Sequence, residues 1–145
     1  MIAVDTNLLV YAHKTGSRFH DITIEALRPL VEGPSPWAIP WQCIHEFLGV
    51  TTNERIYKPH SSLAEAFAFL DTLLASPNVH LLSESSGYLE TLRKVAEPAK
   101  VQGGRVHDAR IAALCLHHGV RELWTADRDF SMFPQLKTRN PLVKP

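Results

Sequence analysis

Short apolar runs alternate along this chain with longer segments of helical periodicity, and this alternation constrains the fold more than any other feature. The four clearest strand-like runs are Ile2–Asp5, Trp37–Ile39, Val79–Leu82 and ELWTAD at 122–127. Leu142–Val143 is a candidate fifth strand that would close the sheet. Strands separated by helices favour a parallel sheet covered on both faces. The sequence therefore predicts an α/β fold with three layers, α/β/α, around a central, mainly parallel twisted sheet of four or five strands.

Helix-capping signals locate the segments between these strands. Asp21 is expected to cap one helix, and Ser62 with Glu65 matches the capping-box pattern at the start of another. Pro98 is expected to stop a helix, and Gly119 has the position of a C-terminal cap. The predicted helices are Asp21–Val31, Trp41–Thr51, Ser62–Ala75, Gly87–Ala96 and VHDARIAALCLHHG at 106–119.

The length and composition suit one globular domain covering residues 1–145. The chain is 45% hydrophobic and 21% charged, and no apolar run exceeds six residues, which excludes a membrane-spanning helix. Asp5 interrupts the N-terminal apolar run where a secretory signal would need an unbroken one. Cys43 and Cys115 are too few for a disulfide framework. We therefore expect a soluble, cytoplasmic protein whose cysteines are core thiols.

Acidic side chains occupy several places that hydrophobic patterning does not explain. Each has a purely structural alternative, because an acid at a strand end caps the next helix and an acid in the first turn complements the helix dipole. A helical acid is often simply solvated, and aspartates are common in turns. No single position decides between structure and chemistry. The acids concerned are Asp5, Glu46, Asp108, Asp127 and Asp129.

The combination of these acids is more specific than any one of them. In a parallel sheet the strands before Asp5 and Asp127 end at the same edge, so the two side chains converge if the strands are neighbours. The helix that carries Asp108 leads into the second strand through a crossover, which brings its first turn to the same edge. The sequence therefore predicts a cluster of carboxylates at the carboxyl end of the sheet.

Clustered carboxylates need a counter-charge. Two of them about 4 Å apart repel by roughly 4 kcal/mol at an effective dielectric constant near 20. Mg²⁺ or Mn²⁺ suits carboxylates with water in the remaining coordination positions, whereas no set of histidines and cysteines is arranged for zinc. Such an ion makes hydroxide available near neutral pH and neutralises charge on phosphate oxygens. This pattern indicates phosphoryl chemistry.

The motifs resemble those of the PIN-domain nucleases, and within them the VapC toxins of prokaryotic toxin–antitoxin pairs. The resemblance rests on Asp5-Thr6-Asn7 after a short strand, on Glu46 in a helix, and on HDARIAALCLHHGVRELWTADRDF near the end of the chain. It implies Mg²⁺- or Mn²⁺-dependent endoribonuclease activity. By position, it implies that the catalytic, metal-binding acids are Asp5, Glu46, Asp108 and Asp127, that Asp129 is an accessory metal ligand, and that Asn7 and Thr125 orient the site.

The resemblance also implies partners. These are an RNA substrate, a cognate VapB-like antitoxin that inserts an arginine into the acidic site, and a second copy of the chain in a homodimer. The broad apolar arc of Ser62–Ala75 is a candidate dimer surface, with a deeply buried helix as the alternative. A catalytically inactive PIN-like module that binds RNA or protein is the alternative function. A dehalogenase-type phosphatase is disfavoured because Asn7 stands where that family needs a second aspartate.

The formal net charge is zero, with 15 basic and 15 acidic residues, which argues against a protein that simply coats nucleic acid. Setting aside the five candidate acids leaves 10 acids against 15 bases, a surplus of five positive charges. The candidates for contacts to RNA phosphates are Arg105, Arg110, Arg55 and Lys58. Ordinary solvated charge is the alternative for each of them.

Overall fold

The computed structural model describes residues 1–144 and contains a five-stranded sheet in which every neighbouring pair is parallel. The strand order is β3-β2-β1-β4-β5. The strands are β1 (Ile2–Val4), β2 (Trp37–Pro40), β3 (Val79–Leu82), β4 (Glu122–Trp124) and β5 (Thr138–Arg139). The predicted parallel α/β sheet is therefore confirmed, with five strands.

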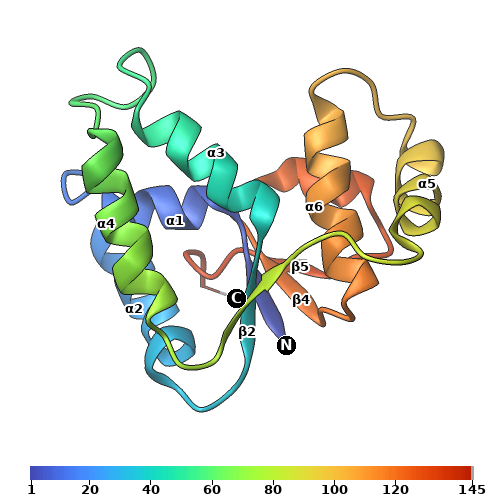
Figure 1. The fold of residues 1–145 in the computed structure, drawn as a ribbon, viewed down its shortest axis with the longest axis horizontal. Coiled ribbons are helices and arrows are strands. Elements are labelled where there is room, and N and C mark those ends of the chain that lie inside the picture. Colours follow the sequence, from blue (N-terminus) through green and yellow to red (C-terminus); the bar gives the residue numbers. More distant parts are fainter. Residues whose placement is uncertain (145) are drawn as a thin grey trace.

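Helices cover both sides of this sheet. In Figure 1, helices α1 to α4 lie to the left of the sheet, and α5 and α6 lie to its right. The helices are α1 (Thr6–His13), α2 (His20–Glu32), α3 (Trp41–Thr51), α4 (Leu63–Leu74), α5 (Tyr88–Ala99) and α6 (Arg105–His117), followed by the short 3-10 helix η1 (Arg128–Met132). The predicted three-layer arrangement is confirmed. No helix within residues 1–144 combines the length and the apolar character needed to cross a membrane.

The core lies where the helices pack on the central strands. Apart from the partly buried Ile2, the residues of β1, β2 and β4 are buried, as expected for parallel strands covered on both faces. Trp37, one of the largest buried side chains, donates from its indole nitrogen to Ser76 Oγ at 3.0 Å, so its only polar atom is satisfied. Cys43 and Cys115 are both buried free thiols, which agrees with the core role predicted for them.

Three differences from the sequence-based prediction are informative. Helix α2 begins at His20, and Asp21 lies in its first turn instead of capping it. Helix α5 continues past Pro98 to Ala99; the Lys94 carbonyl, which a proline at this position cannot pair, accepts a bond from Gln135 Nε2 at 3.2 Å. The fifth strand is the exposed pair Thr138–Arg139, so the prediction of Leu142–Val143 was wrong. This edge strand is exposed, so it does not need the apolar side chains of a strand that is packed under helices.

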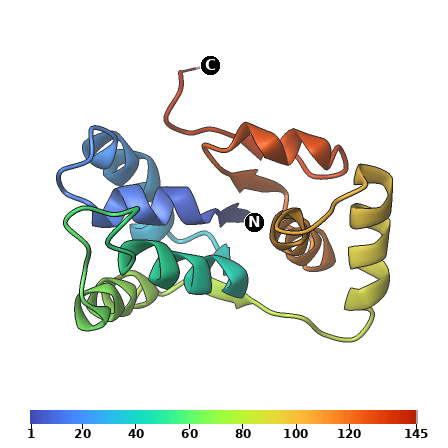
Figure 2. The same cartoon turned by 90° about the horizontal axis from the view of Figure 1, so that it is seen from above.

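The topology creates a crevice between β1 and β4. From β1 the chain builds β2 and β3 on one side of the sheet, and only then adds β4 and β5 on the other side. Ligand sites of open α/β sheets lie at the carboxyl ends of strands where the strand order reverses in this way. Viewed from above in Figure 2, α1 leaves β1 toward one side of this point, while α6 lies on the other side.

Candidate active site

Asp5 stands directly after β1, where it caps the next helix and also lines a cavity. Its Oδ1 accepts a 2.7 Å bond from the Thr6 backbone N–H, so it caps α1. Its Oδ2 accepts a 2.7 Å bond from the Thr125 hydroxyl, at the end of the neighbouring strand β4. The side chain is only 4% exposed, yet it lines a cavity. A helix cap and a member of the acidic site are therefore the same residue.

Asn7 and Thr125 tie the two strand ends together beneath this cavity. The Asn7 amide lies 3.4 Å from both Asp5 Oδ2 and Thr125 Oγ1, and its carbonyl oxygen accepts a 3.2 Å bond from the Ala126 N–H. Thr125 Oγ1 in turn accepts a 3.0 Å bond from the backbone N–H of Asp127. These contacts fix the start of α1 against the loop after β4.

Glu46 approaches the same cavity from α3 and is held by two neutral donors. Its Oε2 accepts a 2.8 Å bond from the Thr6 hydroxyl, and its Oε1 accepts a 3.0 Å bond from Gln42 Nε2, one turn earlier on α3. Arg110 Nη1 donates to Gln42 Oε1 at 2.6 Å, and Arg110 Nη2 pairs with Glu84 at 2.6 Å. Because a guanidinium only donates and a carboxylate only accepts, these contacts fix which way the Gln42 amide points.

Asp108 and Asp127 complete the acidic side of the cavity. Asp108 lies in the first turn of α6 and forms a 3.5 Å ion pair with Arg105. Asp127 caps η1 through a 2.8 Å bond from the Asp129 N–H to its Oδ1. Burial, together with the neighbouring charge of Asp127, raises the pKa of Asp108 against the opposing effect of Arg105. The predicted convergence of Asp5, Asp127 and Asp108 at one edge of the sheet agrees with these positions.

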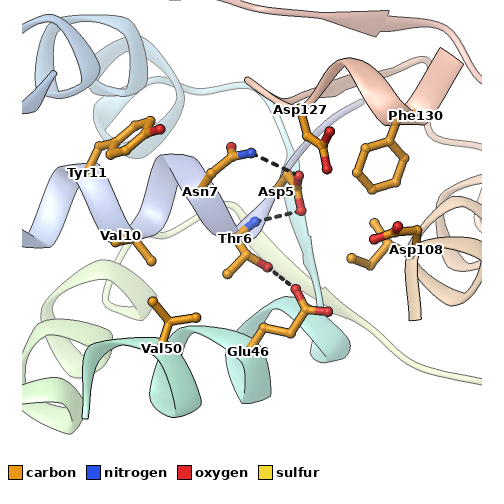
Figure 3. A pocket seen from close by; sticks show the side chains of 11 residues that line it. Asp5, Thr6, Asn7, Val10, Tyr11, Glu46, Val50, Asp108, Asp127 and Phe130 are labelled. Carbon is orange, nitrogen blue, oxygen red and sulfur yellow. Dashed lines mark hydrogen bonds between the residues drawn. The ribbon is translucent and has the colours of Figure 1, made fainter. Parts of the chain in front are cut away.

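The cavity has a volume of about 230 Å³ and mixes acidic, polar and apolar walls. Figure 3 shows Asp5 at its centre, with Glu46 approaching from below and Asp108 and Asp127 from the side of α6 and η1. Val10, Tyr11 and Val50 extend the wall away from the acids, along α1 and α3. Asp129 does not line this cavity, since its carboxylate is exposed and forms a 2.8 Å ion pair with Arg105.

Burial changes the acidity of Asp5 more than that of any other acid of the site. Desolvation raises the pKa of this carboxyl to about 6, although hydrogen bonds from Thr125 and the Thr6 N–H lower it, and the charge of Glu46 adds to the rise. No cationic side chain is among the groups that set this value. The floor of the cavity therefore carries negative charge that neutral donors orient without neutralising.

The donor set fits a hard divalent cation. Carboxylate oxygens, with water in the remaining positions, are the ligands that Mg²⁺ and Mn²⁺ prefer. Within residues 1–144 no three acidic, histidine or cysteine side chains are close enough to hold one ion between them. Mg²⁺ does not require such a cage, because it commonly keeps several waters and binds through one or two carboxylates together with substrate phosphates. Thr6 contacts both Asp5 and Glu46, which holds these two carboxylates in fixed positions at the cavity.

Comparison with known proteins identifies the family. The model of the PIN domain family matches residues 2–135. The chain belongs to the PIN-domain family. Ribonuclease VapC48 of Mycobacterium tuberculosis is 30% identical over 137 residues, which is 94% of each chain. Ribonuclease VapC43 of the same organism is 32% identical over 142 residues, 98% of this chain and 96% of that relative. The predicted resemblance to VapC proteins is therefore confirmed.

Solved structures agree with the PIN fold. The structure of VapBC-1 from nontypeable Haemophilus influenzae contains a chain that superposes with a TM-score of 0.68 at 17% identity. The alignment covers 99% of this chain and 100% of that one. At this identity the likeness concerns the fold alone, and it extends over nearly the full PIN domain described here.

Sequence analysis missed the side chains that support Glu46. Gln42 precedes Glu46 by four residues on α3, a spacing that places both on one helix face, so this partner was open to prediction. Thr6 stands beside Asp5 in the motif Asp5-Thr6-Asn7, but its hydrogen bond to Glu46 was not predicted. Arg110 and Glu84 come from α6 and from the loop after β3, and no local signal in the sequence links those two segments.

Proposed function

We propose that this PIN domain is a metal-dependent endoribonuclease and the toxin of a VapBC-type toxin–antitoxin pair. The observation that carries the proposal is the convergence of Asp5, Glu46, Asp108 and Asp127, from four separate segments, on one cavity at the reversal of strand order. A ribonuclease role is supported by the names of the relatives, which are called ribonucleases. We also propose that residues 1–145 form one such domain.

The acids of the cavity would hold and orient the reacting groups. A bound Mg²⁺ or Mn²⁺ supplies hydroxide near neutral pH and neutralises charge on the phosphate oxygens. Asp5 and Glu46 would hold the ion, each in a fixed direction because Thr6 donates to both through different atoms. Asp108 and Asp127 face the same space from the opposite wall, where they would complete the ligand set or accept a proton from water. Asp129 pairs with Arg105 and is proposed only as an accessory acid.

The apolar wall of the cavity suits the rest of a nucleotide. Tyr11 is a partly exposed aromatic residue that lines the space beside the acids, and aromatic faces stack on bases without selecting a sequence. An RNA strand would thus place a phosphate at the acids and a base against an aromatic ring.

The proposed activity has a direct test. A labelled single-stranded RNA is incubated with the protein in Mg²⁺, Mn²⁺ or EDTA, beside a DNA strand of the same sequence. We expect cleavage of RNA only with a divalent ion, and its loss in Asp108→Asn. The exposed Asp71 on α4 provides the matched control, since Asp71→Asn removes the same charge away from the cavity. Folded protein that leaves varied RNAs intact in both metals would favour the inactive binding module instead.

We further propose two protein partners. A VapB-like antitoxin is supported by the likeness to the solved VapBC-1 structure and by an acidic cavity that suits an arginine of another chain. A homodimer is supported by Leu63 and Phe67 on α4, which are 56% and 47% exposed. Light scattering tests the second proposal, and Leu63→Ser with Phe67→Ser should convert a dimer to monomers.

A further inference from the structure

Two arginines expected to contact RNA phosphates are already engaged within the protein. Arg105 pairs with Asp129 at 2.8 Å and with Asp108 at 3.5 Å. Arg110 pairs with Glu84 and donates to Gln42, both at 2.6 Å. An RNA phosphate would have to displace a carboxylate from either guanidinium. Arg105 and Arg110 are therefore poorly placed to receive the RNA strand, whereas Arg55 and Lys58 are exposed but do not line the acidic cavity.

A second cavity, here called the basic cavity, lies on the other side of Asp127. It is lined by Thr125, Ala126, Asp127, Arg128, Thr138, Arg139, Asn140 and Val143 and has a volume of about 260 Å³. It shares Asp127 with the acidic cavity, so the two spaces adjoin. In Figure 2, η1 and the C-terminal segment, coloured orange to red, lie together along this edge of the molecule.

The arginines of the basic cavity differ from Arg105 and Arg110 because no carboxylate of residues 1–144 lies within ion-pair distance of them. Arg128 and Arg139 are both exposed, and within residues 1–144 neither forms an ion pair. The Arg139 guanidinium carbon lies 5.7 Å from the centre of the Trp124 ring, a cation–π contact that restrains it without neutralising it. Their fork of N–H donors is therefore free to bind an anion.

The remaining groups of the basic cavity complement a phosphodiester. Thr138 contributes a hydroxyl group and Asn140 an amide. Asn140 is restrained because its Oδ1 accepts a 3.0 Å bond from the Leu142 N–H, which leaves its NH₂ group to donate. Guanidinium groups bind phosphate oxygens in bidentate fashion, and such contacts set the position of a nucleic-acid strand without reading its bases. The nearby carboxylate of Glu122 is already paired with Lys137, at 3.4 Å.

We propose that the basic cavity binds an RNA phosphodiester adjacent to the one that is cleaved, with Arg128 and Arg139 as its main ligands. The inference rests on the proposed function, because it assumes an RNA substrate that runs from the acidic cavity past Asp127 into the basic cavity. Much of this subsite comes from residues 138–143, which lie beyond the 2–135 segment matched by the family model. It is thus a feature of this chain's C-terminal segment.

Binding of a labelled eight-nucleotide single-stranded RNA, followed by fluorescence anisotropy in EDTA, tests this subsite without requiring cleavage. Arg128→Gln and Arg139→Gln should each weaken binding about three- to tenfold at 50 mM salt and reduce the slope of log affinity against log salt by about 0.7. Arg139→Lys should restore part of the affinity. The matched control is Arg121→Gln, which removes an exposed arginine without an ion pair just before β4, at the opposite edge of the sheet.

The outcomes separate this subsite from the proposed function. Arginine variants that bind RNA with the affinity and salt slope of Arg121→Gln overturn the subsite, even if the wild type cleaves RNA. Losses confined to Arg128→Gln and Arg139→Gln, with unchanged thermal melting, support it. A wild type that binds as expected but cleaves nothing in Mg²⁺ or Mn²⁺ overturns the nuclease proposal alone. Tighter binding of the cavity to an acidic peptide than to RNA, measured by competition, would also overturn the subsite.

Discussion

The floor and the rim of the acidic cavity hold their carboxylates by different means. On the floor, Asp5 and Glu46 receive hydrogen bonds from neutral groups, namely backbone N–H, hydroxyl and amide donors. On the rim, Asp108 pairs with Arg105, whose side chain is 48% exposed and also pairs with Asp129 just outside the cavity. The floor is built from strand ends and the first residues of helices, whereas the rim is held by a surface ion pair.

The floor carboxylates are therefore oriented without being neutralised, whereas the rim carboxylate Asp108 is partly neutralised by an arginine. Neutral donors fix where a carboxylate points but leave its charge in place, and burial raises the pKa of Asp5 to about 6 even though these donors lower it. An ion pair with an exposed arginine neutralises charge but contributes little free energy. A cation entering the cavity would gain most at the floor, where no side chain competes with it. The following predictions test this division, beginning with the largest effect.

Removing a floor carboxylate should affect RNA cleavage far more than removing an outer one. Asp5→Asn keeps the volume and the helix cap but deletes a charged ligand, so we expect a loss of about 10³-fold in the cleavage rate, equivalent to about 4 kcal/mol. Asp129→Asn should stay within a few-fold of the wild type, because its carboxylate pairs with Arg105 outside the cavity. Initial rates on one labelled RNA measure both. Equal losses in the two variants would contradict the division into floor and rim.

The same variant should stabilise the metal-free protein. The rise in the Asp5 pKa from 3.8 to about 6 means that the folded state binds this proton more tightly than the unfolded state. Stability is therefore lost as pH rises from about 4 to 6, and above pH 6 the full cost is about 3 kcal/mol. Asp5→Asn removes this cost, so its free energy of unfolding in EDTA should exceed that of the wild type by up to this amount at pH 8.

Urea melts of both proteins at pH 8 and pH 5 check the sign. The gain from Asp5→Asn should shrink to about half at pH 5, where the folded carboxyl is largely protonated. Asp71→Asn serves as the control, because its carboxylate is exposed and its melts should follow the wild type at both pH values. A variant less stable than the wild type at pH 8 would show that the Thr125 and Thr6 contacts outweigh the burial of charge.

Sequence reasoning succeeded where the signals are local. Short-range sequence patterns correctly predicted the helix Trp41–Thr51, the strand Val79–Leu82 and the capping box of Ser62 and Glu65. The convergence of Asp5 and Asp127 followed from one topological assumption, that β1 and β4 are neighbours, and the parallel pairing of these strands confirms it.

The sequence-based predictions were wrong where a residue from a distant segment offsets the effect expected from a local sequence pattern. Pro98 does not end α5, because Gln135 satisfies the carbonyl that the proline leaves unpaired. The last strand is polar and exposed, so hydrophobicity pointed instead to Leu142–Val143. Arg110 looks from the sequence like a free surface cation, yet Glu84, on another segment, pairs with it. Such partners depend on tertiary packing and have no counterpart in local periodicity.

Loss of the neutral support for the floor should weaken metal binding without abolishing it. Gln42→Leu places an apolar side chain of similar size at this buried position and removes the donor to Glu46 Oε1, and outer partners of this kind change metal affinity about 10- to 100-fold. Mn²⁺ titration followed by electron paramagnetic resonance measures the change, with the exposed Gln102→Leu as control. In a Glu46→Gln background the same substitution should have little further effect, since Gln42 acts through Glu46.

Loss of the charged support on the rim should have the smallest effect and the opposite sign. Arg105 brings a positive charge beside Asp108 and Asp129, where it competes with any cation that approaches from the rim. Because exposed ion pairs contribute about 0.2–1 kcal/mol, Arg105→Gln should tighten Mn²⁺ binding by no more than about fivefold at low salt. The gain should disappear at about 1 M salt, where the screening length is about 3 Å.

Arg93→Gln is the control: it removes an exposed arginine that is paired on α5, so it should leave the Mn²⁺ affinity unchanged. Weaker binding in Arg105→Gln would mean that the arginine positions the rim carboxylates, so that orientation and neutralisation are not divided between floor and rim as proposed.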